Sequence, residues 1–133
     1  MLSATETHVA QMWARQGRYR IALASMLTAR DIKLSAPHVD LQNVSSTEHN
    51  TSTFYLCMSQ IDSALEWNQR SRATWQRWSE LAAVEFRWPS PQRLAYGQIL
   101  SYANRFEEAK GELSTALEEF LTNEPLIWAM AAA

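Results

Sequence analysis

GQILSYANRFEEAKGELSTALEEFL, residues 97–121, has the pattern of two short helices joined by a tight turn at Ala103-Asn104-Arg105. Small residues recur where two helices must touch, and larger ones recur between them, at Gly97, Leu100, Phe106, Ala109, Leu113 and Ala116. Gly and Ala allow two helix axes to approach closely, while Leu and Phe fill the space on either side. The stretch therefore predicts a helix pair in which Gly97 and Leu100 pack against the second helix.

The same intervals occur near the N-terminus and, more weakly, in the middle of the chain. The N-terminal copy consists of Ala10, Trp13, Tyr19, Ala22, Met26 and Ala29, with a turn at Gln16-Gly17-Arg18. Gly17 suits the left-handed conformation that ends many helices. The middle copy keeps Tyr55, Ile61 and Ala64, but it has the polar residues Ser52, Asn68 and Ser71 at its other positions.

These residues resemble the tetratricopeptide repeat family, whose pattern is small, large, turn, aromatic, Ala, large, Ala. The equivalent residues Ala22, Ala64 and Ala109 are separated by 42 and 45 residues, more than the usual period of ~34. This spacing is similar to the longer repeats of kinesin light chains, bacterial maltose-regulon activators and fungal signalling ATPases. The resemblance implies an all-α fold of antiparallel helix pairs, stacked as a short right-handed α-solenoid. It implies a single domain over 1–133 with about three units, at 4–34, 46–83 and 90–121.

Composition agrees with one folded helical domain and argues against several other classes. Hydrophobic residues make up 47% of the 133 residues and charged residues 20%, which argues against disorder, and only three Gly and four Pro argue against an all-β fold. No apolar run reaches the ~18 residues of a membrane span and no signal peptide is visible, so a cytoplasmic location is expected. The lone Cys57 is expected to be buried and inert, because it lacks a nearby base.

Catalytic, cofactor and metal sites are not expected. The three His share no ligand spacing, and zinc sites need three or four converging ligands. The adjacent pairs Glu107-Glu108 and Glu118-Glu119 point ~100° apart on a helix, so neither pair shares a face. The three Gly are isolated and form no phosphate-binding loop. A small helical enzyme is therefore the least favoured of three function classes.

Periodicity and punctuation place the helices. They are expected at 4–15, 18–33, from 46 or 47 to 59, from 61 to 83 or 86, from Pro91 onward, and at 106–121, with the longest loop at 34–46. Pro89 and Pro91 must interrupt the chain between the fourth and fifth helices. Residues 126–133, LIWAMAAA, start a further or capping helix. Because Leu126, Ile127 and Trp128 are apolar, this helix continues a longer array, packs back or drives self-association.

The tryptophans and the uneven charge suggest contact surfaces. Trp67, Trp75 and Trp78 are spaced to share one helix face, which favours either a core position or a partner groove. Trp88, beside two prolines, is expected to be the most exposed. Residues 67–105 carry a charge of +4 and residues 106–133 carry −5. Nucleic-acid binding is disfavoured by the acidic isoelectric point and by the absence of Lys between Lys33 and Lys110.

The resemblance implies a non-enzymatic scaffold or adaptor that binds a peptide or partner protein on the concave face, which the first helix of each pair lines. At the matching positions the partner-binding residues are Gln11, Arg15, Asn50, Thr53, Gln98 and Tyr102. Gln11 and Gln98 are equivalent, and an amide can both donate to and accept from a peptide backbone. The alternative is a sensor or oligomerisation fragment of a signalling ATPase whose nucleotide-binding domain lies elsewhere.

Overall fold

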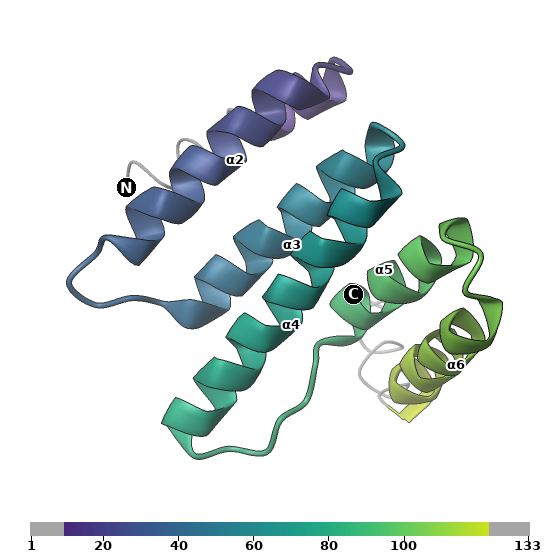
Figure 1. Ribbon diagram of the computed structural model, residues 1–133. Coiled ribbons are helices and arrows are strands. Elements are labelled where there is room, and N and C mark those ends of the chain that lie inside the picture. Colours follow the sequence, from purple (N-terminus) through teal and green to yellow (C-terminus); the bar gives the residue numbers. More distant parts are fainter. Residues whose placement is uncertain (1–9, 123–133) are drawn as a thin grey trace, which may run out of the picture. The chain divides into compact units, whose positions relative to one another are not determined.

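The computed structural model describes residues 10–122, and within them the chain is helical with no strand (Figure 1). Residues 10–15 are helical and precede five further helices: α2 (Tyr19–Leu34), α3 (Leu41–Cys57), α4 (Ile61–Ala82), α5 (Ser90–Tyr102) and α6 (Phe106–Thr122). Each pair α2–α3, α3–α4 and α5–α6 packs side by side. The chain divides into two compact units, Met1–Trp88 and Pro89–Ala133, which are described separately below.

Three turns between helices have the same backbone geometry. The left-handed residue of each turn has a φ of 75°, 60° or 61°, at Gly17, Ser59 and Asn104. In every turn the next residue donates its N–H to the carbonyl five positions earlier, at 2.9 Å. The left-handed residue itself donates to the carbonyl three positions earlier, at 2.9 to 3.1 Å. This is the Schellman arrangement, which satisfies carbonyls at a helix end and turns the chain sharply. The turns predicted at Gly17 and Asn104 are confirmed.

In the second unit, α5 and α6 pack through a glycine. A Cβ added to Gly97 would lie 2.7 Å from Cγ and Cδ2 of Leu113 on α6. Leu100 on α5 and Ala116 on α6 are fully buried. The prediction that Gly97 and Leu100 pack at the interface of this helix pair is confirmed. Arg93 of α5 also forms ion pairs with Glu112 and Glu119 of α6, at 3.7 and 3.6 Å.

In the first unit, α3 and α4 pack through polar side chains. Ser52 and Asn68 hold the positions that correspond to Gly97 and Leu113, and the Asn68 amide donates to the Ser52 hydroxyl at 3.4 Å. Ser45 and Ser71 are also fully buried and hydrogen-bond each other's backbone carbonyl at 2.8 Å. The polar residues that weaken the middle copy of the sequence pattern are thus interior residues that have partners.

α3 also joins α2, through charged and polar groups. Glu48 is 1% exposed and accepts hydrogen bonds from Arg30 of α2 at 3.3 Å and from Thr74 of α4 at 2.5 Å. Lys33 of α2 donates to Thr47 at 2.6 Å. Partial burial lowers the pKa of the Lys33 ammonium, although the charge of Asp40 opposes this shift. The interface between α2 and α3 is therefore a polar clamp beside a small apolar cluster of Ala10, Ala22, Met26 and Phe54.

Several helix boundaries and burials differ from the sequence prediction. The loop expected at 34–46 is shorter, because Asp40 caps a helix that already begins at Leu41, accepting from the Asn43 N–H at 3.2 Å. The expectation that Trp88 is exposed is wrong: it is 1% exposed, and the Arg72 guanidinium lies 5.3 Å from its ring centroid. The expectation that Cys57 is buried is wrong: it is the last residue of α3 and it is exposed.

Candidate interaction surfaces

The predicted partner-binding residues lie in pairs, each pair on one helix. Gln11 and Arg15 are exposed one turn apart in the first helical segment, and Gln98 and Tyr102 are exposed one turn apart on α5. Asn50 and Thr53 of α3 are half-buried, and the Thr53 hydroxyl donates to the His49 carbonyl of its own helix at 3.2 Å. The structure thus leaves Gln11, Arg15, Gln98 and Tyr102 open to a ligand, whereas Thr53 is hydrogen-bonded within its own helix.

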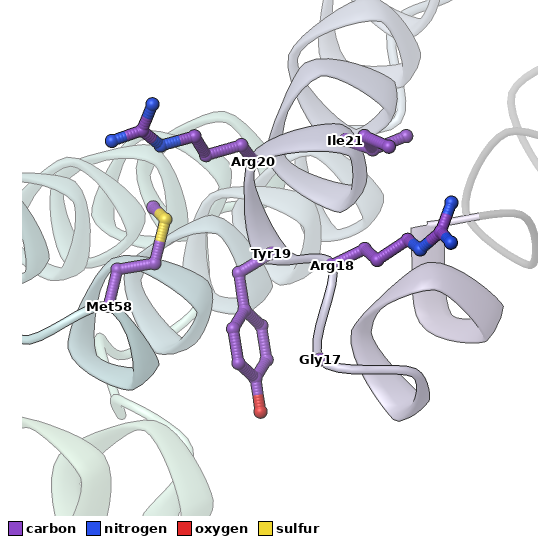
Figure 2. Close-up of a pocket in the computed structure, with 6 residues that line it drawn as sticks. All are labelled: Gly17, Arg18, Tyr19, Arg20, Ile21 and Met58. Atoms are coloured by element: carbon purple, nitrogen blue, oxygen red, sulfur yellow. The ribbon is translucent and has the colours of Figure 1, made fainter.

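A pocket of ≈ 370 Å³ opens at the start of α2, beside the first turn (Figure 2). It is lined by Gly17, Arg18, Tyr19, Arg20, Ile21 and Met58. Met58 follows α3, so the pocket is lined by the turn at Gly17 and by the start of the turn after α3. The walls are mainly apolar, and the side chains of Arg18 and Arg20 extend in opposite directions (Figure 2), with the Arg18 guanidinium 5.3 Å from the centroid of the Trp13 ring.

Tyr19 and Cys57 interact next to this pocket. The pKa of the Tyr19 hydroxyl is raised by the charge of the neighbouring Cys57, by a side-chain hydrogen bond to the same thiol and by desolvation. Sequence reasoning missed this contact, because the two residues are 38 positions apart and meet only when α2 and α3 pack.

The tryptophans of α4 are neither core residues nor an open groove. Trp67, Trp75 and Trp78 are all half-buried. Trp67 lies between two arginines, with the guanidinium carbons of Arg30 and Arg70 at 5.2 and 4.4 Å from its ring centroid. Such cation–π contacts are worth about 0.5–1 kcal/mol each at exposed sites. The ring of Trp67 therefore serves the contact between α2 and α4.

A further surface that sequence reasoning missed lies on α6. Four apolar side chains on this helix are exposed: Phe106 at 62%, Leu117 at 59%, Leu121 at 59% and Phe120 at 38%. Together with the half-buried Leu113 they follow intervals of seven, four, three and one residues, so they form one stripe, called here the α6 stripe. Ala109 and Ala116 already supply the buried face toward α5. The sequence feature that could have revealed this stripe is the width of the apolar pattern on α6, which exceeds what packing against one helix requires.

Neither a metal-binding cluster nor a membrane-spanning helix is found in the described part of the chain. Among residues 10–122, no group of three or more His, Cys, Asp and Glu is placed to hold a metal ion. In the same range, no helix is long and apolar enough to cross a membrane. Leu126, Ile127 and Trp128, predicted to drive self-association, and the further or capping helix predicted at 126–133 lie outside the described residues. No protein-family model matches the chain, and no curated protein matches its sequence.

Proposed function

We propose that this chain is a non-enzymatic, cytoplasmic interaction module of the long-period tetratricopeptide type, built from three helix pairs. The first helices of these pairs are the segment at 10–15, α3 and α5, and the second helices are α2, α4 and α6. Stacked as a solenoid, the first helices would present their free faces to a peptide or a partner protein.

The observation that carries the proposal is the recurrence of the same turn and the same contacts at a fixed spacing. The turn of α3 and α4 and the turn of α5 and α6 are 45 residues apart, and both have the Schellman bonds. At the same spacing, the contact of Ser52 with Asn68 corresponds to that of Gly97 with Leu113. The pair Glu48–Thr74 corresponds in the same way to Arg93–Glu119. Matching contacts in unlike chemistry support a shared architecture better than composition alone.

The binding residues of this proposal are Gln11, Arg15, Asn50, Thr53, Gln98 and Tyr102. Gln11 and Gln98 occupy equivalent, exposed positions, and their amides can pair with the N–H and C=O groups of an extended peptide. Arg15 and Tyr102 follow one turn later and add a charge and an aromatic surface, the side chains that most often dominate interface energies.

A peptide-display selection tests the proposal. The full chain is immobilised and exposed to a random peptide library, and the enriched peptides are synthesised and measured by fluorescence anisotropy. The double variants Q11A/R15A and Q98A/Y102A should each weaken binding by ~10-fold or more, since each removes side chains of the hot-spot class. The matched control Q76A changes an exposed amide of α4 outside these faces and should leave binding unchanged. Failure to enrich any peptide, or equal affinity for all variants, would refute the proposal.

The α6 stripe favours a second candidate function, the oligomerisation fragment of a signalling ATPase. Single exposed apolar residues are common on protein surfaces, but α6 exposes four large apolar side chains together, and such patches mark association sites. Light scattering on the full chain distinguishes this candidate: a mass of two or more chains that returns to one chain in L117D supports it, and a single-chain mass contradicts it.

A further inference from the structure

The equivalent face of α2 shows what the α6 stripe is for. At a spacing of 87 residues, Leu113, Leu117 and Phe120 correspond to Met26, Arg30 and Lys33. In α2 this face is covered by α3: Met26 is fully buried, Arg30 pairs with Glu48 and Lys33 donates to Thr47. A second helix of this fold therefore uses this face to receive another helix. On α6, within residues 89–122, Leu113 packs against Gly97 of α5, whereas Leu117 and Phe120 remain exposed.

The chemistry of the α6 stripe specifies what can cover it. Where α2 has a basic pair that meets Glu48 and Thr47 of α3, α6 has Leu117 and Phe120, so its cover must be apolar at the centre. Along the helix the α6 stripe measures ~22 Å, from Phe106 to Leu121 at 1.5 Å per residue. It occupies ~100° of the circumference, which matches the apolar face of one amphipathic helix of four turns.

The charges beside the α6 stripe specify the rest of the partner. Glu112 and Glu119 pair with Arg93, and Glu108 pairs with Arg105 at 2.7 Å. Glu107 and Glu118 have no ion-pair partner among the described residues. Both lie ~40–60° beyond Leu121 around the helix, one at each end of the stripe. The apolar surface is thus bordered by two available carboxylates.

We propose that the α6 stripe is a docking surface for a basic amphipathic helix of a partner protein. The apolar residues of the partner helix, at i, i+3 or i+4, and i+7, would cover Leu117, Phe120 and the part of Leu113 that α5 leaves exposed. A Lys or Arg on one flank would reach Glu107 and Glu118, which fixes the orientation of the helix. Two copies of α6 meeting through this face would bring like charges together, because the helix carries five Glu and one Lys, so its charge favours a basic partner helix over the oligomer that is the second candidate function.

The test uses two labelled synthetic peptides of 16 residues with identical Leu stripes, one flanked by Lys and one by Glu. Binding to the full chain is measured by fluorescence anisotropy at 50 mM and 300 mM salt. The Lys peptide should bind ~10-fold tighter than the Glu peptide at low salt, with a smaller ratio at high salt because exposed charges are screened. L117D should abolish binding of both peptides. E107K/E118K should reverse the preference.

Matched controls separate the proposal from its competitors. L81D places the same substitution on α4, where Leu81 is 65% exposed, and should bind as the unmodified chain does. Binding without preference for Lys, or binding that survives L117D, overturns the proposal. A dimer that L117D dissociates, with no peptide binding, assigns the surface to a second copy. Binding that appears only in L126S/I127S/W128S assigns it to the chain's own segment, and either outcome overturns the partner helix. None of these variants touches Gln98 or Tyr102, so the first-helix proposal is tested independently.

Discussion

Substituting the two helical glycines of α6 and α5 by alanine should change stability in opposite directions. In Gly97→Ala the new Cβ would lie 2.7 Å from Cγ and Cδ2 of Leu113, whereas carbon atoms prefer ~3.5–4.0 Å. In Gly111→Ala the new Cβ meets no atom within 4 Å. Both substitutions remove the entropic cost of a glycine within a helix, which is worth about 0.8–1 kcal/mol.

The magnitudes decide the sign. Overpacking a tight contact costs about 1–3 kcal/mol, because Cγ lies in the middle of the Leu113 side chain and moves only if the whole residue shifts. Gly97→Ala should therefore lower the free energy of unfolding by about 1 kcal/mol, while Gly111→Ala should raise it by about 0.5–1 kcal/mol. With an m-value of about 2 kcal/mol/M, the two urea midpoints should differ by about 0.75–1 M.

Urea unfolding followed by circular dichroism at 222 nm measures both variants, and a double-mutant cycle identifies the cause. In the Leu113→Ala background the close contact is gone, so Gly97→Ala should become stabilising, as Gly111→Ala is. If Gly97→Ala stabilises the unmodified chain as much as Gly111→Ala does, α5 and α6 do not approach at Gly97 and the reasoning is refuted.

Three further perturbations follow from the first unit. Replacing the buried Glu48 by Ala should lower the free energy of unfolding by about 2–4 kcal/mol, measured by urea unfolding, because it breaks a buried ion pair. Burial lowers the pKa of His49 below its unfolded value of about 6.5, so the unfolded state binds more protons in acid. The free energy of unfolding should therefore fall as the pH drops below ~6.5. The urea midpoint should decrease less between pH 7.5 and pH 5.5 in His49→Gln than in the unmodified chain. The exposed control His38→Gln should show the same decrease as the unmodified chain. Gly17→Ala should lower the free energy of unfolding, and with it the thermal midpoint, by the ~1 kcal/mol that a Cβ costs in the left-handed region. Ser59→Gly, at the same place in the next turn, should raise the thermal midpoint. Equal shifts in the two variants would contradict the shared turn geometry.

The helix pairs with apolar interiors could be predicted from the sequence because their spacing repeats in the right residue types. Gly97, Ala109 and Ala116 identify a close helix contact by size alone, and the structure places them there. Gly17 identifies its turn because a left-handed residue is costly for any side chain with a Cβ. These features depend on local chemistry, which a sequence displays directly.

The start of α3 and the polar interior could not be predicted in the same way. Residues 41–46 have the composition of a loop, and the Asp40 cap and the pairing of Ser45 with Ser71 favour the helix there. Tertiary partners supplied from 26 residues away override the local preference. The burial of Trp88 has the same origin, since Arg72 approaches its ring from a helix that ends before it.

The candidate surfaces also divide into those that the repeated pattern predicts and those that depend on tertiary packing. Exposure of Gln11 and Gln98 follows from their place in a repeated pattern, and both are exposed. The contact of Tyr19 with Cys57 and the exposed side of α6 depend on which helices pack and which do not. Periodicity gives the apolar residues of a helix, but it does not give the number of neighbours that cover them.

The buried hydroxyl and amide pairs of α3 and α4 make this part of the chain non-interchangeable. In a protein assembled from similar helix pairs, an apolar helix could pack against any other second helix, at the risk of an incorrect order. Ser45 and Ser52 would lose their partners if α3 packed against a helix such as α6, which lacks Asn68 and Ser71 at the matching positions. An unsatisfied buried polar group costs about 1–3 kcal/mol, so the two contacts penalise every mispaired arrangement. A chimera that exchanges α4 for α6 would therefore misfold although each helix remains intact. Ser45 and Ser52 thus determine which second helix packs against α3.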